Sequence, residues 1–301
     1  MPAPCSSLIY VPVGPGTRFE FLLDTLRSIE RFADPRHRLL LVDDSAEGLG
    51  ARAKEAMPEI DLLVLREAGC DATYDVDGGL FVNVARTVRY ATTAYSFQVL
   101  MRIDTDALMC NPGADTRAIE LLDSNPRLGM IGSFRTRCDG HDRAADFPAI
   151  GKLVRRNECS PDEELASLMR SLLSEAVANG YEYGEHVIAP GSIMSRAACE
   201  ALCAHPLYED PRFGKASLSD DHLHSIFLRA VGLESADFAC DDLPLGVWWW
   251  HIQWSPEELV RRGKSVVHSV RGYGDCDENA VRAEFRRLAA LSTDANFDSR
   301  V

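Results

Sequence analysis

Two aspartates separated by one residue, Asp104 and Asp106, close the strand-like segment 96–106 (SFQVLMRIDTD). Carboxylate oxygens are hard ligands, and a pair of them at the end of a strand can hold Mg²⁺ or Mn²⁺. A cation held there can neutralise negative charge on a phosphate-bearing ligand. An Asp-x-Asp pair is equally typical of a solvated turn in an acidic protein, so the spacing alone leaves both interpretations open.

Two further acidic pairs occupy chemically useful positions. Asp43 and Asp44 end the apolar run HRLLLVDD, and Asp220 and Asp221 open the segment LSDDHLHSIFLRAVG directly after Ser219. A carboxylate at such a position can act as a general base. The first turn of a helix also favours aspartate through the helix dipole, and a Ser cap precedes this pair. The two roles are compatible.

The elements that must position these residues alternate along the chain. Apolar runs typical of buried strands alternate with segments of helical periodicity, which predicts an α/β fold with a mixed, mainly parallel sheet and helices on both faces. Ligands bind outside the carboxyl ends of such strands, so residues 11–16, 43–44 and 104–106 should converge. The expected strands are 7–13, 37–44, 61–65, 96–106, 128–134 and 186–195; the expected helices are 17–32, 49–57, 78–94, 114–124, 160–180 and 218–232.

Three details of this pattern are specific. In the helix 160–180, Ser160 is the expected cap and Gly180 the expected stop. The stretch 135–160 is charged and weakly patterned, which predicts a mobile loop. The loop VPVGPGTR at 11–18 can bring backbone amides close to a phosphate, although it matches neither the dinucleotide fingerprint nor the P-loop.

Composition excludes several classes of partner. The net charge of −14 should repel nucleic acid and acidic lipid surfaces. The sequence contains no apolar stretch long enough to span a bilayer, and its first residues lack the pattern of a secretion signal. The nine cysteines are odd in number and scattered, which favours reduced thiols. We therefore expect a soluble cytoplasmic protein; a homo-oligomer is compatible with the sequence.

The order of the motifs resembles a known family. The segments LLLVDDS, LMRIDTDALM, APGSIMSRAA and LSDDHLHSIFLRAVG, following a first strand with a loop, resemble the GT-A glycosyltransferases, and in particular the large inverting family 2-like nucleotide-sugar transferases. The resemblance spans roughly residues 7–270. It implies transfer of a sugar from a nucleoside-diphosphate donor, commonly a UDP-sugar, to a hydroxyl acceptor with inversion and with Mn²⁺ or Mg²⁺ as cofactor.

The resemblance also assigns residues on the donor side. It implies that Pro12 and Val13 contact the base and ribose and that Asp44 accepts a hydrogen bond from the base. It makes Asp106 the principal metal ligand, with Asp104 touching the ribose or sharing the metal. Ser45 stands where the family has glycine, so the turn after Asp44 differs.

The same resemblance assigns catalytic residues. Asp221 corresponds to the aspartate that deprotonates the acceptor hydroxyl, and Asp220 replaces the preceding glutamate of the family. If Asp221 is only a cap, a retaining mechanism at the same metal site remains open.

The C-terminal segment KSVVHSVRG resembles one that closes over the metal in many relatives. It implies His268 as a third, nitrogen ligand, with His251 as a competing candidate. Arg271, and as a second candidate Lys264, would face the diphosphate. Trp249, Trp250 and Trp254 belong to a cluster that contains every tryptophan of the chain; it could form an acceptor-binding wall or lid, or simply pack.

Two alternative functions stay open. The opening GPGTRFEFLL superficially resembles the start of sugar-nucleotide pyrophosphorylases, but their phosphate-gripping lysine is missing. A GT-A-like protein that binds nucleotide or carbohydrate without turnover is the other alternative. The expected layout is a single domain over 1–292, with a nucleotide-sugar half (1–134), an acceptor half (135–270) and a C-terminal helix (271–292), followed by a flexible tail (293–301).

Overall fold

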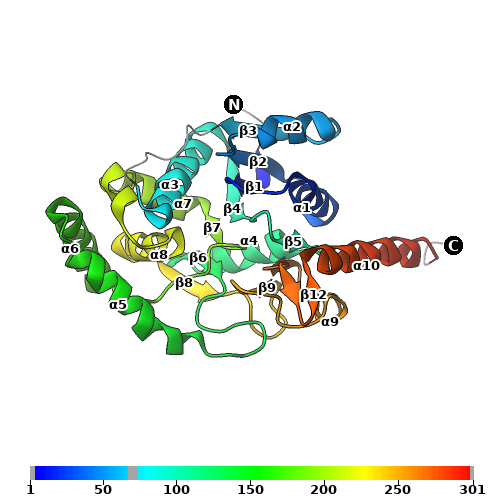
Figure 1. Cartoon of the computed structure of the whole chain (residues 1–301). Coiled ribbons are helices and arrows are strands. Elements are labelled where there is room, and N and C mark those ends of the chain that lie inside the picture. The colour runs from blue at the N-terminus through cyan, green and yellow to red at the C-terminus, as the bar shows by residue number, and fades with distance from the viewer. Residues whose placement is uncertain (1–3, 67–73, 299–301) are drawn as a thin grey trace.

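A seven-stranded mixed sheet forms the centre of the protein, in the order β3-β2-β1-β4-β7-β6-β8 (Figure 1). The computed structural model describes residues 4–66 and 74–298. β7 is antiparallel to both of its neighbours, and the remaining pairs are parallel, which confirms the predicted fold class. The strands are β1 Cys5–Val13, β2 Arg38–Asp43, β3 Leu62–Arg66, β4 Phe97–Arg102, β6 Leu128–Gly132, β7 Ile193–Ser195 and β8 Glu234–Asp237.

Helices cover both faces of the sheet because successive residues of a strand point to opposite faces. In β1, Leu8 and Tyr10 belong to the cluster under α3, α6, α7 and α8, whereas Ile9 and Val11 belong to the cluster under α1, α2 and α4. The helices are α1 Phe19–Phe32, α2 Leu49–Ala56, α3 Val76–Ala94, α4 Ala114–Ser124, α6 Glu163–Ala178, α7 Arg196–Ala204 and α8 Asp220–Ala230.

A smaller C-terminal layer adds two short sheets. β5 (Leu108–Met109), β10 (Val266–His268) and β9 (Leu245–Val247) form one sheet, and β11 (Gly272–Tyr273) pairs with β12 (Cys276–Asp277) in the other. A third apolar cluster joins this layer to α9 (Pro256–Arg261) and α10 (Glu278–Asp298). The layer places His268 beside the carboxyl end of β4.

The prediction of a mobile loop at 135–160 is wrong. The segment contains a 3-10 turn at Arg143–Asp146 followed by the helix α5, Phe147–Glu158. Phe147, Gly151 and Val154 are buried at helical spacing on one face of α5, and the charged residues between them face solvent. The frequent charges hid this narrow apolar stripe from the sequence pattern.

The bounds of four elements also differ from expectation. α6 is capped by Asp162, which accepts from Leu165 N at 3.2 Å, rather than by Ser160. The expected strand 186–195 is regular only over Ile193–Ser195, and the expected strand 96–106 ends at Arg102. The C-terminal helix begins at Glu278 and continues to Asp298, well into the expected tail.

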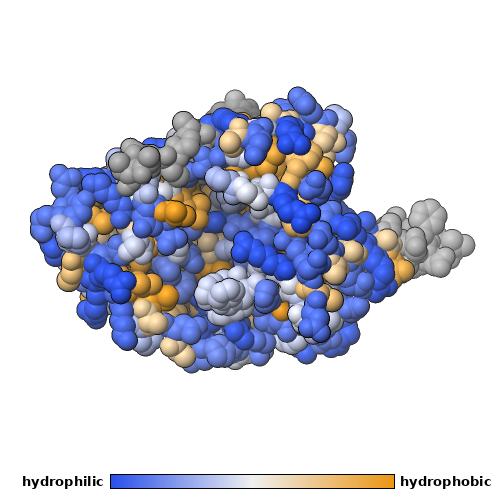
Figure 2. Space-filling view, in the orientation of Figure 1, coloured by the Kyte–Doolittle hydropathy of each residue, from blue (hydrophilic) through white to orange (hydrophobic). Residues whose placement is uncertain are grey.

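The visible face of the molecule is predominantly hydrophilic, with hydrophobic patches separated by polar residues (Figure 2). Among the described residues, no helix combines the length and apolar character that crossing a membrane would require.

Candidate active site

The carboxyl ends of β1, β2 and β4 meet at one edge of the sheet, as the parallel register requires. Val13 lies beside Asp43, and Tyr10 lies beside Arg102. A cavity of about 500 Å³ opens at this edge between β1, β2 and the start of α3. Pro12, Val13 and Asp44, three residues expected to contact a nucleotide, line it.

The wall of the cavity formed by α3 was not foreseen. Asp77, Leu80, Asn83 and Thr87 line it at successive turns of the helix. The amide of Asn83 donates to Asp44 at 3.5 Å, and burial, reinforced by the charge of Asp43, raises the pKa of Asp44. The sequence signal that could have indicated this wall is the presence of polar residues on a predominantly apolar helix.

Ser45 organises the turn that follows Asp44. Its Oγ accepts from Leu49 N at 2.9 Å, and Asp43 accepts from Ser45 N at 3.0 Å and from Gly50 N at 2.9 Å. The hydroxyl therefore supplies the link between the end of β2 and the start of α2. Asp43 is buried in this network, whereas Asp44 is left facing the cavity.

The three expected metal ligands come together beyond the end of β4. Ligand atoms of Asp104, Asp106 and His268 lie within 4.8 Å of one another. His268 Nδ1 donates to the carbonyl of Trp248 at 2.6 Å, which directs Nε2 at Asp106 Oδ2, 3.3 Å away. Two carboxylates and one imidazole are a donor set that suits Mn²⁺ or Mg²⁺, so these residues fit a divalent cation.

Within this group, Asp106 is the residue with polar contacts to three neighbouring side chains. Its Oδ2 accepts from Ser269 Oγ at 2.8 Å and from Arg271 Nε at 2.9 Å. Burial would raise the pKa of Asp106, but His268, Arg271 and Ser269 outweigh burial and hold that pKa well below its usual range. Asp106 is therefore ionised and ready to bind a cation.

Asp104 is linked to the start of α8 by a buried arginine that the sequence reasoning missed. Arg102 Nε and Nη2 donate to the two oxygens of Asp104 at 2.6 and 3.2 Å, and Nη1 donates to Asp220. Burial raises the pKa of Asp220 to about 6, although the charge of Arg102 opposes this. The signal was an arginine within the otherwise apolar run VLMRID.

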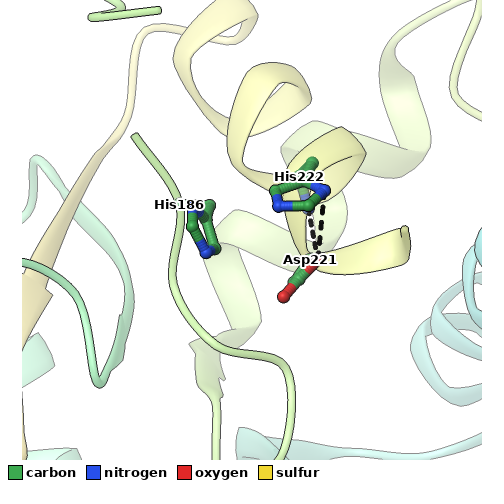
Figure 3. A group of neighbouring side chains, drawn as sticks. All are labelled: His186, Asp221 and His222. Atoms are coloured by element: carbon green, nitrogen blue, oxygen red, sulfur yellow. Dashed lines mark hydrogen bonds and ion pairs between the residues drawn. The ribbon is translucent and has the colours of Figure 1, made fainter. Parts of the chain in front are cut away.

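Asp221 lies one residue further on, among two histidines (Figure 3). It accepts hydrogen bonds from Ser219 Oγ and from His222 N, the latter at 2.9 Å. Burial would raise the pKa of Asp221, but His222 and the Ser219 hydroxyl overcome burial and hold it well below its usual range. Ser219 starts α8 as expected, yet its hydroxyl bonds side chains rather than a helix amide.

Arg271 and Lys264, the two side chains expected to face a diphosphate, lie in different surroundings. The side chain of Arg271 is 64% exposed, and its Nε forms an ion pair with Asp106. Lys264 is fully buried, and its Nζ donates to the carbonyls of Ala239, Asp241 and Leu243 at 2.7–3.0 Å. The expectation that Lys264 faces a diphosphate is therefore wrong, because its ammonium holds the loop before β9.

His268 rather than His251 belongs to the metal-ligand group in the described part of the chain. The tryptophans divide between two roles. Trp249 and Trp250 are 54% and 57% exposed, with ring centroids 4.5 Å apart. Trp254 packs against the C-terminal apolar cluster, with Arg262 over its ring. Of the three expected tryptophans, Trp249 and Trp250 are the exposed ones.

Neither a family model nor a curated protein matches this sequence. Among solved structures, it is similar to the mannosyltransferase PcManGT from Pyrobaculum calidifontis in complex with GDP-Man and Mn²⁺ (16% identity, TM-score 0.43, covering 79% of this chain and 55% of that one). It is also similar to the mannosyltransferase Ktr4p from S. cerevisiae (12% identity, TM-score 0.44, covering 75% and 66%). This chain thus spans between half and two thirds of these proteins' lengths, and so distant a likeness assigns it no activity or substrate.

Proposed function

We propose that this protein is a glycosyltransferase that moves a sugar from a nucleoside-diphosphate donor, of the uridine series, to a hydroxyl acceptor. The observation that carries the proposal is a juxtaposition at one sheet edge. A nucleotide-sized cavity lined by Pro12, Val13 and Asp44 lies at the ends of β1 and β2, and the group Asp104, Asp106 and His268 follows the adjacent strand β4. In open α/β sheets, ligands bind in the crevice outside the carboxyl ends of the strands, which is where this cavity and this group lie.

The uridine assignment rests on Asp44. A carboxylate accepts the N3–H of uracil, and the neighbouring Asn83 amide can donate to a ring carbonyl beside it. Pro12 and Val13 supply apolar surface for the base.

Asp104, Asp106 and His268 would hold Mn²⁺ or Mg²⁺. Such a cation would neutralise the charge that develops on the leaving diphosphate. Arg271 supports the same task, because its exposed guanidinium can leave Asp106 and pair with a phosphate oxygen when donor binds.

The first turn of α8, which carries Asp220 and Asp221, supplies the proton acceptor in this proposal. Asp221 lines a small cleft that shares Tyr10 and Val84 with the donor cavity. A base in this first turn supports attack by the acceptor hydroxyl with inversion at the anomeric carbon. Trp249 and Trp250 offer an exposed aromatic surface for an acceptor ring.

The test is nucleotide-dependent thermal stabilisation of the wild type, Asp106→Ala and a control, Asp123→Ala, at an exposed position of α4. A ligand at 100 times its Kd stabilises the native state by about 2.7 kcal/mol. For a chain of this length that raises Tm by about 4 °C.

We expect UDP with Mn²⁺ to raise the Tm of the wild type and of Asp123→Ala, and Asp106→Ala to lose the Mn²⁺-dependent part. Stabilisation by GDP in place of UDP would overturn the uridine assignment. The absence of any shift with UDP or GDP would refute the proposed function.

A further inference from the structure

A serine hydroxyl links Asp221 to His222 at the start of α8. Ser219 Oγ contacts Asp221 Oδ1, and it lies 2.8 Å from His222 Nδ1. The hydroxyl has one proton and the ionised carboxylate has none, so the serine donates to Asp221. The contact with the imidazole must then use the proton of His222 Nδ1. In the neutral ring this leaves Nε2 of His222 as an unprotonated base.

His186 lies beside Asp221 and His222, on the loop before β7, but both of its ring nitrogens already have hydrogen-bond partners (Figure 3). Its Nδ1 donates to the carbonyl of Gly184 at 2.9 Å, and its Nε2 accepts from Arg143 Nη2 at 2.7 Å. Burial lowers the pKa of His186 to about 3, so the ring is neutral. It packs edge-on against His222, with 4.5 Å between ring centroids.

A metal ion is a poor occupant of the group His186, Asp221 and His222, although their ligand atoms lie within 4.8 Å of one another. The Nε2 lone pair of His186 already binds a guanidinium. The positive charge of the buried Arg143 beside it would also repel a cation. Proton transfer suits this group better than metal binding.

His222 lies near Asp77, a residue of the donor-cavity wall. Asp77 lines that cavity, and burial raises its pKa while the nearby His222 opposes the rise. The charged and titratable groups that face His222 are thus Asp221 on its own helix, Asp77 from α3 and His186, with Arg143 behind it. A hydroxyl bound at the Asp77 wall of the cavity would lie near this imidazole.

We propose that Nε2 of His222 removes the proton from the attacking hydroxyl, and that Asp221 acts through Ser219 as a positioning residue. The inference rests on the proposed glycosyl transfer. The hydroxyl proton moves to His222 Nε2 and the hydroxyl oxygen bonds to the anomeric carbon. The bond from that carbon to the diphosphate oxygen breaks, and the diphosphate leaves with the electron pair. The imidazolium is stabilised by Asp221 through the serine hydroxyl.

The environment of Asp221 explains this division of roles. Asp221 Oδ1 accepts hydrogen bonds from Ser219 Oγ and His222 N, which stabilise the ionised carboxylate and make it a weak proton acceptor. The pair follows the logic of a catalytic triad, in which the carboxylate orients the imidazole and does not take the proton.

The kinetic test compares His222→Gln with His141→Gln, the same substitution at an exposed histidine of the 137–142 turn. The assay is UDP release from UDP-glucose, UDP-galactose or UDP-N-acetylglucosamine, with water as acceptor, as a function of pH. We expect His222→Gln to lower kcat by about 10²–10⁴-fold and to abolish the acid limb of the pH profile. The Kd for UDP, measured by calorimetry, should be unchanged in both variants.

The pH profile of Asp221→Asn distinguishes a positioning role of Asp221 from a merely structural one. Removal of the negative charge disfavours the imidazolium, so the acid limb should shift to lower pH while activity falls less than in His222→Gln. Nitrogen-15 NMR of labelled histidines, assigned by the loss of the His222 signal in His222→Gln, should show Nδ1–H and an unprotonated Nε2 in the neutral ring.

Three results would overturn the inference. One is activity of His222→Gln equal to that of His141→Gln, with loss of activity in Asp221→Asn. Another is an Nε2–H tautomer of neutral His222. The third is Mn²⁺ broadening of the His222 signal in Asp106→Ala, which would make the group a metal site. If the unaltered protein neither binds a nucleotide nor cleaves a donor, the proposed function itself fails and this inference falls with it.

Discussion

Replacing Arg102 with methionine should destabilise the protein far more than any surface charge change. The guanidinium is 5% exposed and binds Asp104 and Asp220 at once. Methionine retains an unbranched apolar stem but leaves the carboxylates without their cation. Removing one partner of a buried ion pair costs about 3–5 kcal/mol, because the remaining charge stays buried.

The loss should also depend on pH. The pKa of Asp220 is about 6 in the folded protein, above the value of about 3.9 for an unperturbed aspartate. Its contribution to stability is therefore fully present below about pH 4 and is lost as the pH rises through about 6. Without Arg102 the carboxyl pKa rises further, so Arg102→Met should lose more relative to wild type at pH 8 than at pH 6.

Urea unfolding at pH 6 and pH 8 measures both effects. The matched control is Arg127→Met, because Arg127 is 75% exposed in a surface pair with Glu234 and should cost at most about 1 kcal/mol. The double variant Arg102→Met/Asp220→Asn should recover part of the loss. The reasoning is refuted if Arg102→Met unfolds at the same urea concentration as Arg127→Met, or if its loss is greater at pH 6.

Two further outcomes follow from packing and exposure. Gly78→Ala should destabilise the protein by about 1–3 kcal/mol, because a Cβ there would lie 2.5 Å from the Phe213 carbonyl oxygen. In the control Gly14→Ala the new Cβ meets nothing within 4 Å, so stability should change by less than about 0.5 kcal/mol. Urea unfolding compares the two variants. The double variant Trp249→Ala/Trp250→Ala should leave Tm nearly unchanged, because both residues are more than half exposed. It should weaken binding of carbohydrate acceptors in a saccharide binding screen. A marked drop in Tm would assign these rings to packing.

The sequence determined the frame of the fold and the place of the site. Period-2 and period-3.6 patterns are local, so most strands and helices could be predicted from their own residues. Parallel strands present their carboxyl ends at one edge, which is why Pro12, Asp44 and the Asp104–Asp106 pair could be expected to meet before any distance was known. The helix α5 was not predicted because only two of its four buried positions, Phe147 and Val154, carry apolar side chains, and charged residues surround them.

Only the tertiary structure decided which side chains share a proton or a charge. Arg102 meets Asp220 across 118 residues of sequence, and His186 meets His222 from a loop without a regular pattern. Lys264 was expected at a phosphate and instead donates to three backbone carbonyls. Such partnerships depend on ångström-scale distances and rotamers set by the packing of distant segments, and local sequence patterns contain no information about those distances.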